Sequence, residues 1–314
     1  MNILVTGARG FVGRAVCEHL AGAGHAVRAA ARAPLAAGTA GAFFPVRDVC
    51  DPVGWDAALS GCEVVVHLAG LAHLPRGAFA AHEVERVNAD GTANVAALAA
   101  RAGVRRFVLM SSVKASGDAS VGAPMTEEDA PRPVDAYGRA KLAAERRLIE
   151  LARQGGMAFT VLRPPLVYGP GVRANFLALM RAVRARRPLP LASVRNARSL
   201  VYVGNLAAAV AACVGHPGAA DRVFLVSDGE DVSTPGLLRG VAAALGVRPV
   251  LFPFPPALLR ATATLVGRGE QAARLLDSLQ LDTARIRGEL GWRPPFSLAE
   301  GLAATASWFR AAHG

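Results

Sequence analysis

Short apolar runs alternate with longer amphipathic stretches through the first half of the chain. The runs are largely continuous rather than alternately apolar and polar, which is typical of strands buried on both faces of a parallel sheet. Helical periodicity covers 11–23 and 90–102, and Gly103 fits the C-cap of the second helix. We therefore predict an α/β fold, a Rossmann-type doubly wound parallel sheet. The predicted strands are 3–6, 25–30, 43–47, 64–68, 107–111 and 160–163.

The pattern changes after residue 165. Loops at 168–171, 187–190 and 253–256 interrupt shorter helices, and an apolar run near 222–226 is expected to return a strand to the main sheet. We expect residues 1–165 to form the Rossmann domain and residues 166–314 mainly a smaller C-terminal region that binds the substrate. No internal repeat or low-complexity linker separates them, so we expect the two parts to share one cleft.

Composition excludes several classes of protein. Hydrophobic residues make up 52% of the chain and charged residues 19%, a globular balance. The chain begins with a strand and a glycine turn rather than a signal peptide, and its apolar stretches are interrupted before they could span a bilayer. We expect a cytoplasmic protein with no membrane span and no metal. The cysteines lack metal-ligand spacing and are interpreted as reduced core thiols: Cys17, Cys50, Cys62 and Cys213.

The net charge of +11 first suggests nucleic acid as a partner. The arginines are scattered, however, and no basic tract is interleaved with aromatic residues, so we expect no nucleic-acid partner. A phosphate-bearing cofactor and substrate would also suit positive charge. Of the 35 basic residues only Lys114 and Lys141 are lysine, and the other 33 are arginine. A lysine is therefore more informative in this chain than it usually is.

A glycine-rich turn, TGARGFVG at 6–13, joins the first predicted strand to the first helix. Gly7 permits the tight turn, Gly10 lets the backbone approach a pyrophosphate, and Gly13 allows close packing of helix on strand. The start of the following helix then offers free N–H groups to the phosphates. The motif predicts NAD(P) binding by residues 1–165, with Gly7, Arg9, Gly10, Phe11, Val12 and Gly13 against the cofactor.

The choice of dinucleotide depends on the end of the second strand. An acid usually stands there to hold the ribose 2′-hydroxyl, but this chain has Ala31, followed by Arg32. Together with Arg9, Arg32 would suit a 2′-phosphate, which favours NADP(H), with NAD(H) as the alternative. The lesser alternative is that both are ordinary surface residues of an arginine-rich chain.

Two further strand ends are expected to contact the cofactor. Asp48 and Val49 follow the third strand and could reach the adenine, while Leu68, Ala69 and Gly70 follow the fourth. Small residues there would let the backbone lie against the dinucleotide. The neighbouring histidine at 67 is interpreted as a packed side chain rather than a catalyst, because nothing acidic is placed to tune it.

The central constellation is Ser112, after the fifth strand, with Tyr137 and Lys141 in the sequence YGRAK. A spacing of four puts Tyr137 and Lys141 on one helical face. A phenol with its ordinary pKa of about 10 is too weakly acidic to act as a base near neutral pH. A nearby ammonium and a positively charged nicotinamide would lower that pKa, and Ser112 could orient the reacting oxygen. Lys141 would also bind the nicotinamide ribose.

These residues resemble the extended short-chain dehydrogenase/reductase family, of the NAD-dependent epimerase/dehydratase type, over nearly the whole chain. The resemblance is carried by TGxxGxxG at Gly7, Gly10 and Gly13, VNADGT at 87–92, Ser112, YxxxK at Tyr137 and Lys141, LRPPLVYGPG at 162–171, RSLVYVGNL at 198–206 and the closing segment at 281–302. The sequence is most similar to bacterial UDP-sugar 4-epimerases and 4-keto reductases. This implies that Asn175 and Arg198 contact the UDP phosphates and that Pro164 and Leu166 pass near the nicotinamide.

The chain departs from the family pattern at a few positions. Asn205 replaces a common aspartate and Ala140 a frequent serine, both at supporting positions. The 4,6-dehydratases of the family carry Thr-Asp-Glu where this chain has Ser112, Val113 and Lys114. The acid pair needed to eliminate water is absent, so we set dehydratase activity aside.

Three functions remain. The favoured hypothesis is NADPH-dependent reduction of a 4-keto nucleotide sugar, because the missing acid at Ala31 suits an exchangeable cofactor. The alternative is a UDP-sugar 4-epimerase, acting for example on UDP-glucose or UDP-N-acetylglucosamine, which uses the same three residues. A lower alternative is a non-catalytic cofactor-binding regulator, although relatives of that kind typically lose the Tyr/Lys pair. The resemblance also implies a homodimer through the helices that contain Asp90 and Tyr137.

Overall fold

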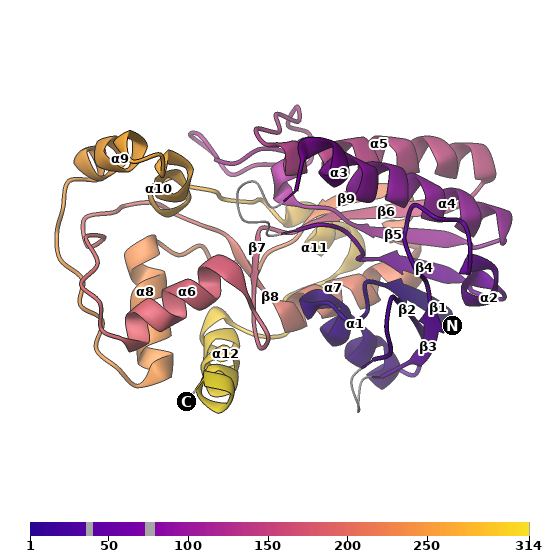
Figure 1. Cartoon of the computed structure of the whole chain (residues 1–314), viewed down its shortest axis with the longest axis horizontal. Coiled ribbons are helices and arrows are strands. Elements are labelled where there is room, and N and C mark those ends of the chain that lie inside the picture. The colour runs from indigo at the N-terminus through magenta and orange to yellow at the C-terminus, as the bar shows by residue number, and fades with distance from the viewer. Residues whose placement is uncertain (36–39, 73–78, 314) are drawn as a thin grey trace.

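A parallel sheet of seven strands forms the centre of the larger part of the molecule (Figure 1). The computed structural model describes residues 1–35, 40–72 and 79–313. The strand order is β3-β2-β1-β4-β5-β6-β9, and every neighbouring pair runs parallel. The chain reverses its direction of winding between β1 and β4, which is where such sheets bind ligands. The strands are β1 (Asn2–Thr6), β2 (Ala26–Ala31), β3 (Ala42–Pro45), β4 (Val64–His67), β5 (Arg106–Met110), β6 (Ala158–Arg163) and β9 (Arg222–Leu225).

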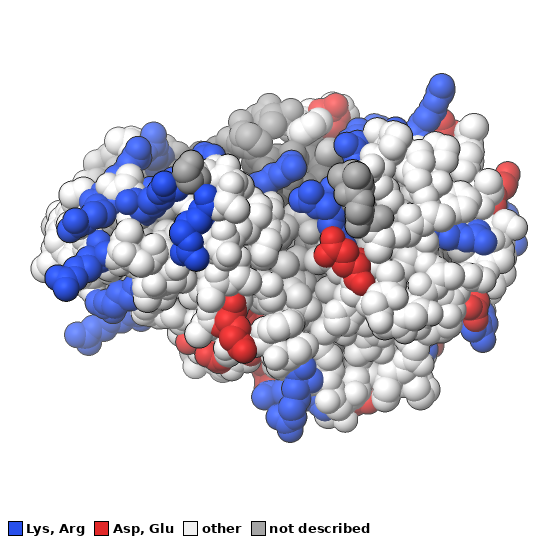
Figure 2. Space-filling view, turned by 90° about the horizontal axis from the view of Figure 1, so that it is seen from below, with Lys and Arg blue, Asp and Glu red and all other residues white. Residues whose placement is uncertain are grey.

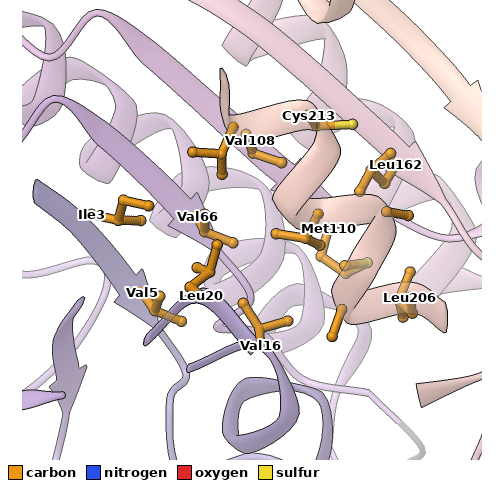
Figure 3. Packing of buried hydrophobic residues seen from close by; sticks show 14 of the residues in the cluster. Ile3, Val5, Val16, Leu20, Val66, Val108, Met110, Leu162, Leu206 and Cys213 are labelled. Atoms are coloured by element: carbon orange, nitrogen blue, oxygen red, sulfur yellow. The ribbon is translucent and has the colours of Figure 1, made fainter. Parts of the chain in front are cut away.

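Helices cover both faces of this sheet, because successive side chains of each buried strand point to opposite sides. Ile3 and Val5 pack with α1 and α7 in one core, whereas Leu4 belongs to the core under α2, α4 and α5 (Figures 1 and 3). The helix α3 packs on α5. The bounds are α1 (Phe11–Gly22), α7 (Val203–Gly215), α2 (Trp55–Leu59), α3 (Ala81–Glu85), α4 (Gly91–Arg101) and α5 (Ala136–Gly155).

A smaller lobe with its own core lies beyond the carboxyl ends of the strands (Figure 1). It contains a two-stranded parallel sheet of β7 (Leu166–Tyr168) and β8 (Leu200–Tyr202). Its helices are α6 (Ala174–Arg184), α8 (Thr234–Leu245), α9 (Pro256–Leu265), α10 (Gly269–Leu276) and α12 (Leu298–His313). The remaining elements are α11 (Ala284–Leu290), which packs on β9, and the short helices η1 (Arg86–Asp90), η2 (Val113–Ala115) and η3 (Pro217–Ala219).

The predicted fold class is confirmed, and each predicted strand forms within a few residues of its expected position. The returning strand is β9, which pairs with β6 at the edge of the sheet. The helix α7 was not foreseen: it lies in a region assigned mainly to substrate binding, yet it packs on α1 beneath the sheet. It could not be anticipated because its apolar surface carries no sign of which layer it will cover.

Membrane and metal features can be examined over the described part of the chain. Within it, no helix is both long and apolar enough to cross a bilayer. Nor do histidine, cysteine and acidic side chains gather there in threes that could hold a metal ion. All four cysteines are free, and burial raises the pKa of the Cys17 and Cys213 thiols to about 12. These two thiols are therefore unreactive core groups.

Candidate active site

The glycine loop between β1 and α1 is shaped by close backbone contacts. Gly7 has φ +67°, and a Cβ there would lie 2.8 Å from the Ala69 nitrogen, so only glycine fits. A Cβ at Gly13 would lie 2.2 Å from the Gly7 carbonyl oxygen. Gly10 is exposed at the start of α1, where no side chain caps the helix and the first turn has no acid. The first N–H groups of α1 are therefore available to an anion, as a dinucleotide pyrophosphate requires.

Thr6 ties this loop to the end of β4. Its hydroxyl oxygen accepts hydrogen bonds from the Leu68 and Ala69 amides, both at 3.1 Å, and lies 2.9 Å from His67 Nδ1. Burial, reinforced by Lys141, lowers the pKa of His67 to about 3. His67 is therefore a neutral packed side chain, as the sequence predicted.

The residues expected beside the adenine ribose differ in their exposure. Ala31 is buried at the end of β2, whereas Arg9 and Arg32 are exposed. Asp48, after β3, accepts a hydrogen bond from the Cys50 amide at 3.0 Å and pairs with Arg86 at 3.1 Å. Burial opposes ionisation of Asp48, but these two contacts outweigh it and lower its pKa. Asp48 is thus a fixed carboxylate, and its contact with adenine stays a prediction, as does that of Val49 beside it.

A buried asparagine fixes the loop after β4. Asn88, in the π-helix η1, accepts a hydrogen bond from the Leu71 amide and donates one to the Leu71 carbonyl, both at 3.1 Å. A Cβ at Gly70 would lie 2.4 Å from Asn88 Oδ1 and 3.4 Å from Lys141 Nζ, so the loop passes directly over Lys141. Asn88 is not one of the predicted site residues, although it lies in the VNADGT motif at 87–92. Single π turns are frequent at functional sites.

Ser112, Tyr137 and Lys141 come together as predicted. Ser112 lies two residues after the end of β5, at the N-cap of η2. It hydrogen-bonds to Tyr137 on the first turn of α5. Lys141, one turn further, is 5% exposed; its Nζ donates to the Met110 carbonyl at 3.0 Å and lies 5.9 Å from the centre of the Tyr137 ring. These three polar groups therefore meet at the carboxyl end of β5, beside the glycine loop and Gly70.

Burial dominates the electrostatics of this group. It raises the pKa of Tyr137 to about 12, although the hydrogen bond from Ser112 acts in the opposite direction. It lowers the pKa of Lys141 to about 8, against the pull of Glu145. In the protein alone, loss of solvation therefore outweighs the groups that lower the pKa of Tyr137, and the lowering expected from the Lys141 ammonium together with a bound nicotinamide stays a prediction.

A buried ion pair supports α5 through its contacts with the ends of β5 and β6. Glu145 on α5 accepts hydrogen bonds from Ser111 and from Arg163 Nε at 3.0 Å, and Arg163 Nη1 donates to Ser116 at 3.1 Å. The Glu145 and Arg163 side chains are only 2% and 6% exposed. The pair joins α5 to the ends of β5 and β6, which fixes where Lys141 projects. Sequence spacing could not reveal it, since its partners meet only after the sheet has formed.

The expected substrate residues lie in the smaller lobe. Arg198 Nη1 donates to the Asp277 carbonyl at 2.8 Å, and burial lowers the pKa of the Arg198 guanidinium. Asn175 is exposed on the first turn of α6. Just before it, a Cβ at Gly171 would lie 3.1 Å from Arg14 Nη2 of α1, so this loop approaches the dinucleotide side.

The remaining predicted contacts flank β7. Pro164 accepts a hydrogen bond from the Val113 amide at 2.9 Å, beside Ser112, and Leu166 begins β7. The structure thus brings the LRPPLVYGPG segment close to both Ser112 and the start of α1. Contacts of Asn175 and Arg198 with phosphate, and of Pro164 and Leu166 with nicotinamide, stay predictions.

This arrangement defines a class of protein: a Rossmann enzyme that binds a nicotinamide dinucleotide beside a Ser–Tyr–Lys group. The family model described as "NAD dependent epimerase/dehydratase family" matches residues 3–227. The chain belongs to this family, within the extended short-chain dehydrogenases/reductases, and is an enzyme of NAD-dependent epimerase/dehydratase type.

Three relatives illustrate the likeness. A UDP-glucose 4-epimerase of Vibrio cholerae is 39% identical over 98% of this chain and 95% of its own length. The crystal structure of UDP-glucose 4-epimerase with UDP-glucose from Thermotoga maritima has a TM-score of 0.81 and 25% identity, with full coverage of both chains. The structure of Thermus thermophilus UDP-glucose 4-epimerase in complex with NAD has a TM-score of 0.81 and 26% identity, over 99% of this chain and 100% of its own.

Proposed function

We propose that this protein is an NAD-dependent UDP-sugar 4-epimerase. The observation that carries the proposal is the Ser112–Tyr137–Lys141 group beside an uncapped glycine loop. The relative from Vibrio cholerae, similar over nearly the whole chain, and the Thermus thermophilus structure with NAD support an epimerase that uses NAD over the reductase that the sequence favoured.

Each side chain has a defined task in this reaction. Bound NAD would supply a reversible hydride acceptor for the hydrogen on C4 of the sugar. Tyr137 would take the proton of the 4-hydroxyl as that carbon is oxidised to a ketone, and would return the proton to the same oxygen when the ketone is reduced with the opposite configuration. Ser112 hydrogen-bonds the reacting oxygen and Tyr137 alike, and the Lys141 ammonium stabilises the phenolate.

The substrate phosphates have a proposed site in the smaller lobe. Arg198 and Asn175 would bind the diphosphate, since a guanidinium suits phosphate oxygens in both charge and geometry. Arg198 is held by the Asp277 carbonyl, so its position is set before the substrate arrives. We further propose that the chain forms a homodimer through α4 and α5, which light scattering would test.

The residues beside Ser112 argue against elimination of water. Val113 is buried, and the Lys114 ammonium is paired with Asp118 and Asp135. Neither residue supplies the acid pair that the dehydratases of the family carry at these positions. The proposed chemistry is therefore oxidation and reduction at one carbon.

A second candidate is a 4-keto reductase that uses NADP(H). The observation in its favour is the buried Ala31 with Arg9 and Arg32 exposed around it, a surface that suits a 2′-phosphate. A reductase must exchange its cofactor after each turnover, whereas an epimerase regenerates it. Binding titrations with NAD and NADP would test this point, and tighter binding of NADP would favour the reductase.

The deciding experiment supplies UDP-glucose, and separately UDP-N-acetylglucosamine, to the purified enzyme without added cofactor. An epimerase that retains NAD forms the 4-epimer until the equilibrium ratio is reached. Product that stops at one equivalent of enzyme, or appears only with NADPH and a 4-keto sugar, would replace the epimerase by the reductase. If Tyr137→Phe matches the wild type with its true substrate, the residue is not the acid–base group, as in a non-catalytic regulator.

A further inference from the structure

Lys114 has no role in the chemistry described so far. It is one of two lysines in a chain with 33 arginines, and the other lysine, Lys141, belongs to the catalytic group. Lys114 lies in the short helix η2, two residues after Ser112. Its occurrence there suggests that a compact ammonium is needed, because arginine serves nearly every other cationic position in this protein.

The Lys114 ammonium joins η2 to the start of the catalytic helix. Its Nζ donates to Asp135 Oδ2 and, at 3.3 Å, to Asp118 Oδ2. Asp135 is the N-cap of α5, and its second oxygen accepts the Gly138 amide at 2.8 Å. Lys114 therefore holds the side chain of the N-cap residue Asp135, two positions before Tyr137, by an ion pair.

Backbone packing brings the same two segments together. A Cβ at Gly138 would lie 2.4 Å from the Lys114 carbonyl oxygen, so the first turn of α5 rests directly on the main chain of η2. The Ser112 side chain accepts the Lys114 amide at 3.3 Å. Lys114 therefore contacts the start of α5 twice, through its backbone carbonyl at Gly138 and through its ammonium at Asp135. These two contacts set the position of Tyr137 relative to Ser112.

Charge gives this contact a second consequence. The Tyr137 side chain faces Ser112 and the Lys141 ammonium. Besides burial, the negative charge of Asp135 also raises the pKa of the Tyr137 phenol. Asp135 itself faces Lys114 from η2 and, less directly, Arg274 from α10. Among the described residues, Lys114 is the one cationic side chain that hydrogen-bonds to the Asp135 carboxylate.

We propose that Lys114 is a positioning residue for Tyr137: its ammonium holds the helix cap Asp135 and neutralises the charge of Asp135 beside the acid–base phenol. Loss of the ammonium would leave a bare carboxylate near Tyr137 and make the phenolate harder to form. This inference rests on the proposed function only in giving Tyr137 the acid–base role.

The test compares the pH profile of kcat/KM for Lys114→Met with that of the wild type. The acid limb, where Tyr137 must lose its proton, should move to higher pH by about half a unit to one unit. Activity should fall about three- to tenfold at neutral pH and recover as pH rises. Activity lost equally at every pH would overturn the proposal, because it would mean a purely structural role.

A double variant separates charge from structure. Asparagine is also a good N-cap, so Asp135→Asn keeps the bond to Gly138 while removing the charge. In that background Lys114→Met should no longer move the acid limb, and a persistent shift would overturn the proposal. Arg139→Met is the matched control: it removes an equal charge from the first turn of α5, where Arg139 bonds to the Val134 carbonyl rather than to Asp135, and should leave the limb in place.

A measurement without turnover keeps this proposal distinct from the epimerase assignment. Ionisation of Tyr137 in the NAD-bound protein is followed by tyrosinate absorbance, as the difference between each variant and its Tyr137→Phe counterpart. Lys114→Met should raise the midpoint by the same amount as in the kinetic profile, and an unchanged midpoint counts against the proposal. If UDP-sugars are not epimerised while this shift occurs, the proposed function fails and the role of Lys114 stands.

Discussion

Burial shifts the pKa values of Tyr137 and Lys141 in opposite directions, although the two residues lie one helical turn apart. Loss of solvation disfavours whichever form is charged, so it raises the pKa of the phenol to about 12 and lowers that of the amine to about 8. The site therefore holds a neutral phenol ready to give a proton. The positive charge of oxidised nicotinamide, when bound, would favour the phenolate that takes one.

Removal of the Tyr137 hydroxyl should abolish most of the activity without unfolding the protein. General acid–base catalysis contributes about 10²–10⁴-fold, so kcat of Tyr137→Phe for UDP-glucose should fall by that factor. The thermal midpoint should stay close to that of the wild type, because the ring remains. Tyr202→Phe deletes a hydroxyl outside the catalytic group and should keep kcat within about twofold. Equal losses in both variants would contradict the assignment.

The buried ammonium of Lys141 should give stability a defined pH dependence. Its pKa is about 8 in the folded protein and 10.5 without burial, so between these values the unfolded chain binds more protons. The free energy of unfolding of the wild type should therefore rise through this window relative to that of Lys141→Met. The lost bond to the Met110 carbonyl adds an offset that does not depend on the charge of the lysine.

Urea unfolding of both proteins on either side of this window measures the effect. The difference in free energy of unfolding, wild type minus Lys141→Met, should be more favourable to the wild type near pH 10.5 than below pH 8. A difference that does not change with pH would show that burial does not lower the pKa of Lys141 in the folded protein.

At the scale of elements, the start of α1 combines two requirements at one turn. The helix must leave its first amides uncapped for a phosphate, and it must approach β1 closely enough to aim them. Gly13 serves the second requirement, because a side chain there would meet backbone on two sides: the Gly7 carbonyl at 2.2 Å and the Ala8 Cα at 2.8 Å. Neither neighbour is a flexible side chain that could move aside.

Alanine at two glycines of the same helix should have opposite effects. Gly13→Ala should lower the free energy of unfolding by about 1–3 kcal/mol through overpacking and weaken NAD binding. Gly22→Ala, at the other end of α1 with nothing within 4 Å of the added Cβ, should raise it by roughly 0.5–1 kcal/mol and leave binding unchanged. Denaturant unfolding and NAD titration measure both, and a tolerated Gly13→Ala would mean that the loop is not a rigid cradle.

At the scale of the whole molecule, positive charge is concentrated in the smaller lobe. The segments that carry the strands and helices of this lobe, 166–202, 232–280 and 298–313, contain three acids, Glu270, Asp277 and Glu300, against thirteen arginines. Figure 2 shows basic side chains gathered over this lobe, with acidic side chains nearer the centre of that face. The lobe would thus present a positive field to the proposed anionic substrate on its way to the site. The arginines are Arg173, Arg181, Arg184, Arg186, Arg187, Arg195, Arg198, Arg239, Arg248, Arg260, Arg268, Arg274 and Arg310.

Salt should therefore slow capture of the substrate more than its conversion. A field of this kind speeds the encounter with a doubly charged UDP-sugar and is screened over about 10 Å at 0.1 M salt. We expect kcat/KM to fall several-fold over a tenfold rise in ionic strength while kcat changes little. Charge reversal at Arg186 and Arg187, both exposed, should reduce this salt dependence. A kcat/KM that is independent of salt would contradict the field argument.

The sequence by itself determined the features that depend on local spacing. Continuous apolar runs predicted a parallel sheet because both faces of each strand are covered, and YxxxK put Tyr137 and Lys141 on one face because a helix turns every 3.6 residues. The glycine spacing likewise predicted the loop at Gly7, because the turn and the close approach that it makes are local. These features follow from backbone geometry over a few residues.

Only the tertiary structure decided what depends on distant segments meeting. The packing of α7 on α1, the hold of Asn88 on the loop after β4, and the Glu145–Arg163 pair join positions that no sequence period relates. The direction of the pKa of Tyr137 was decided in the same way, because burial depends on every element packed around the phenol. Lys114 illustrates both kinds of information. The sequence shows that lysine is rare in this chain, but the ion pair of Lys114 with Asp135 forms only because the tertiary structure brings η2 and α5 together.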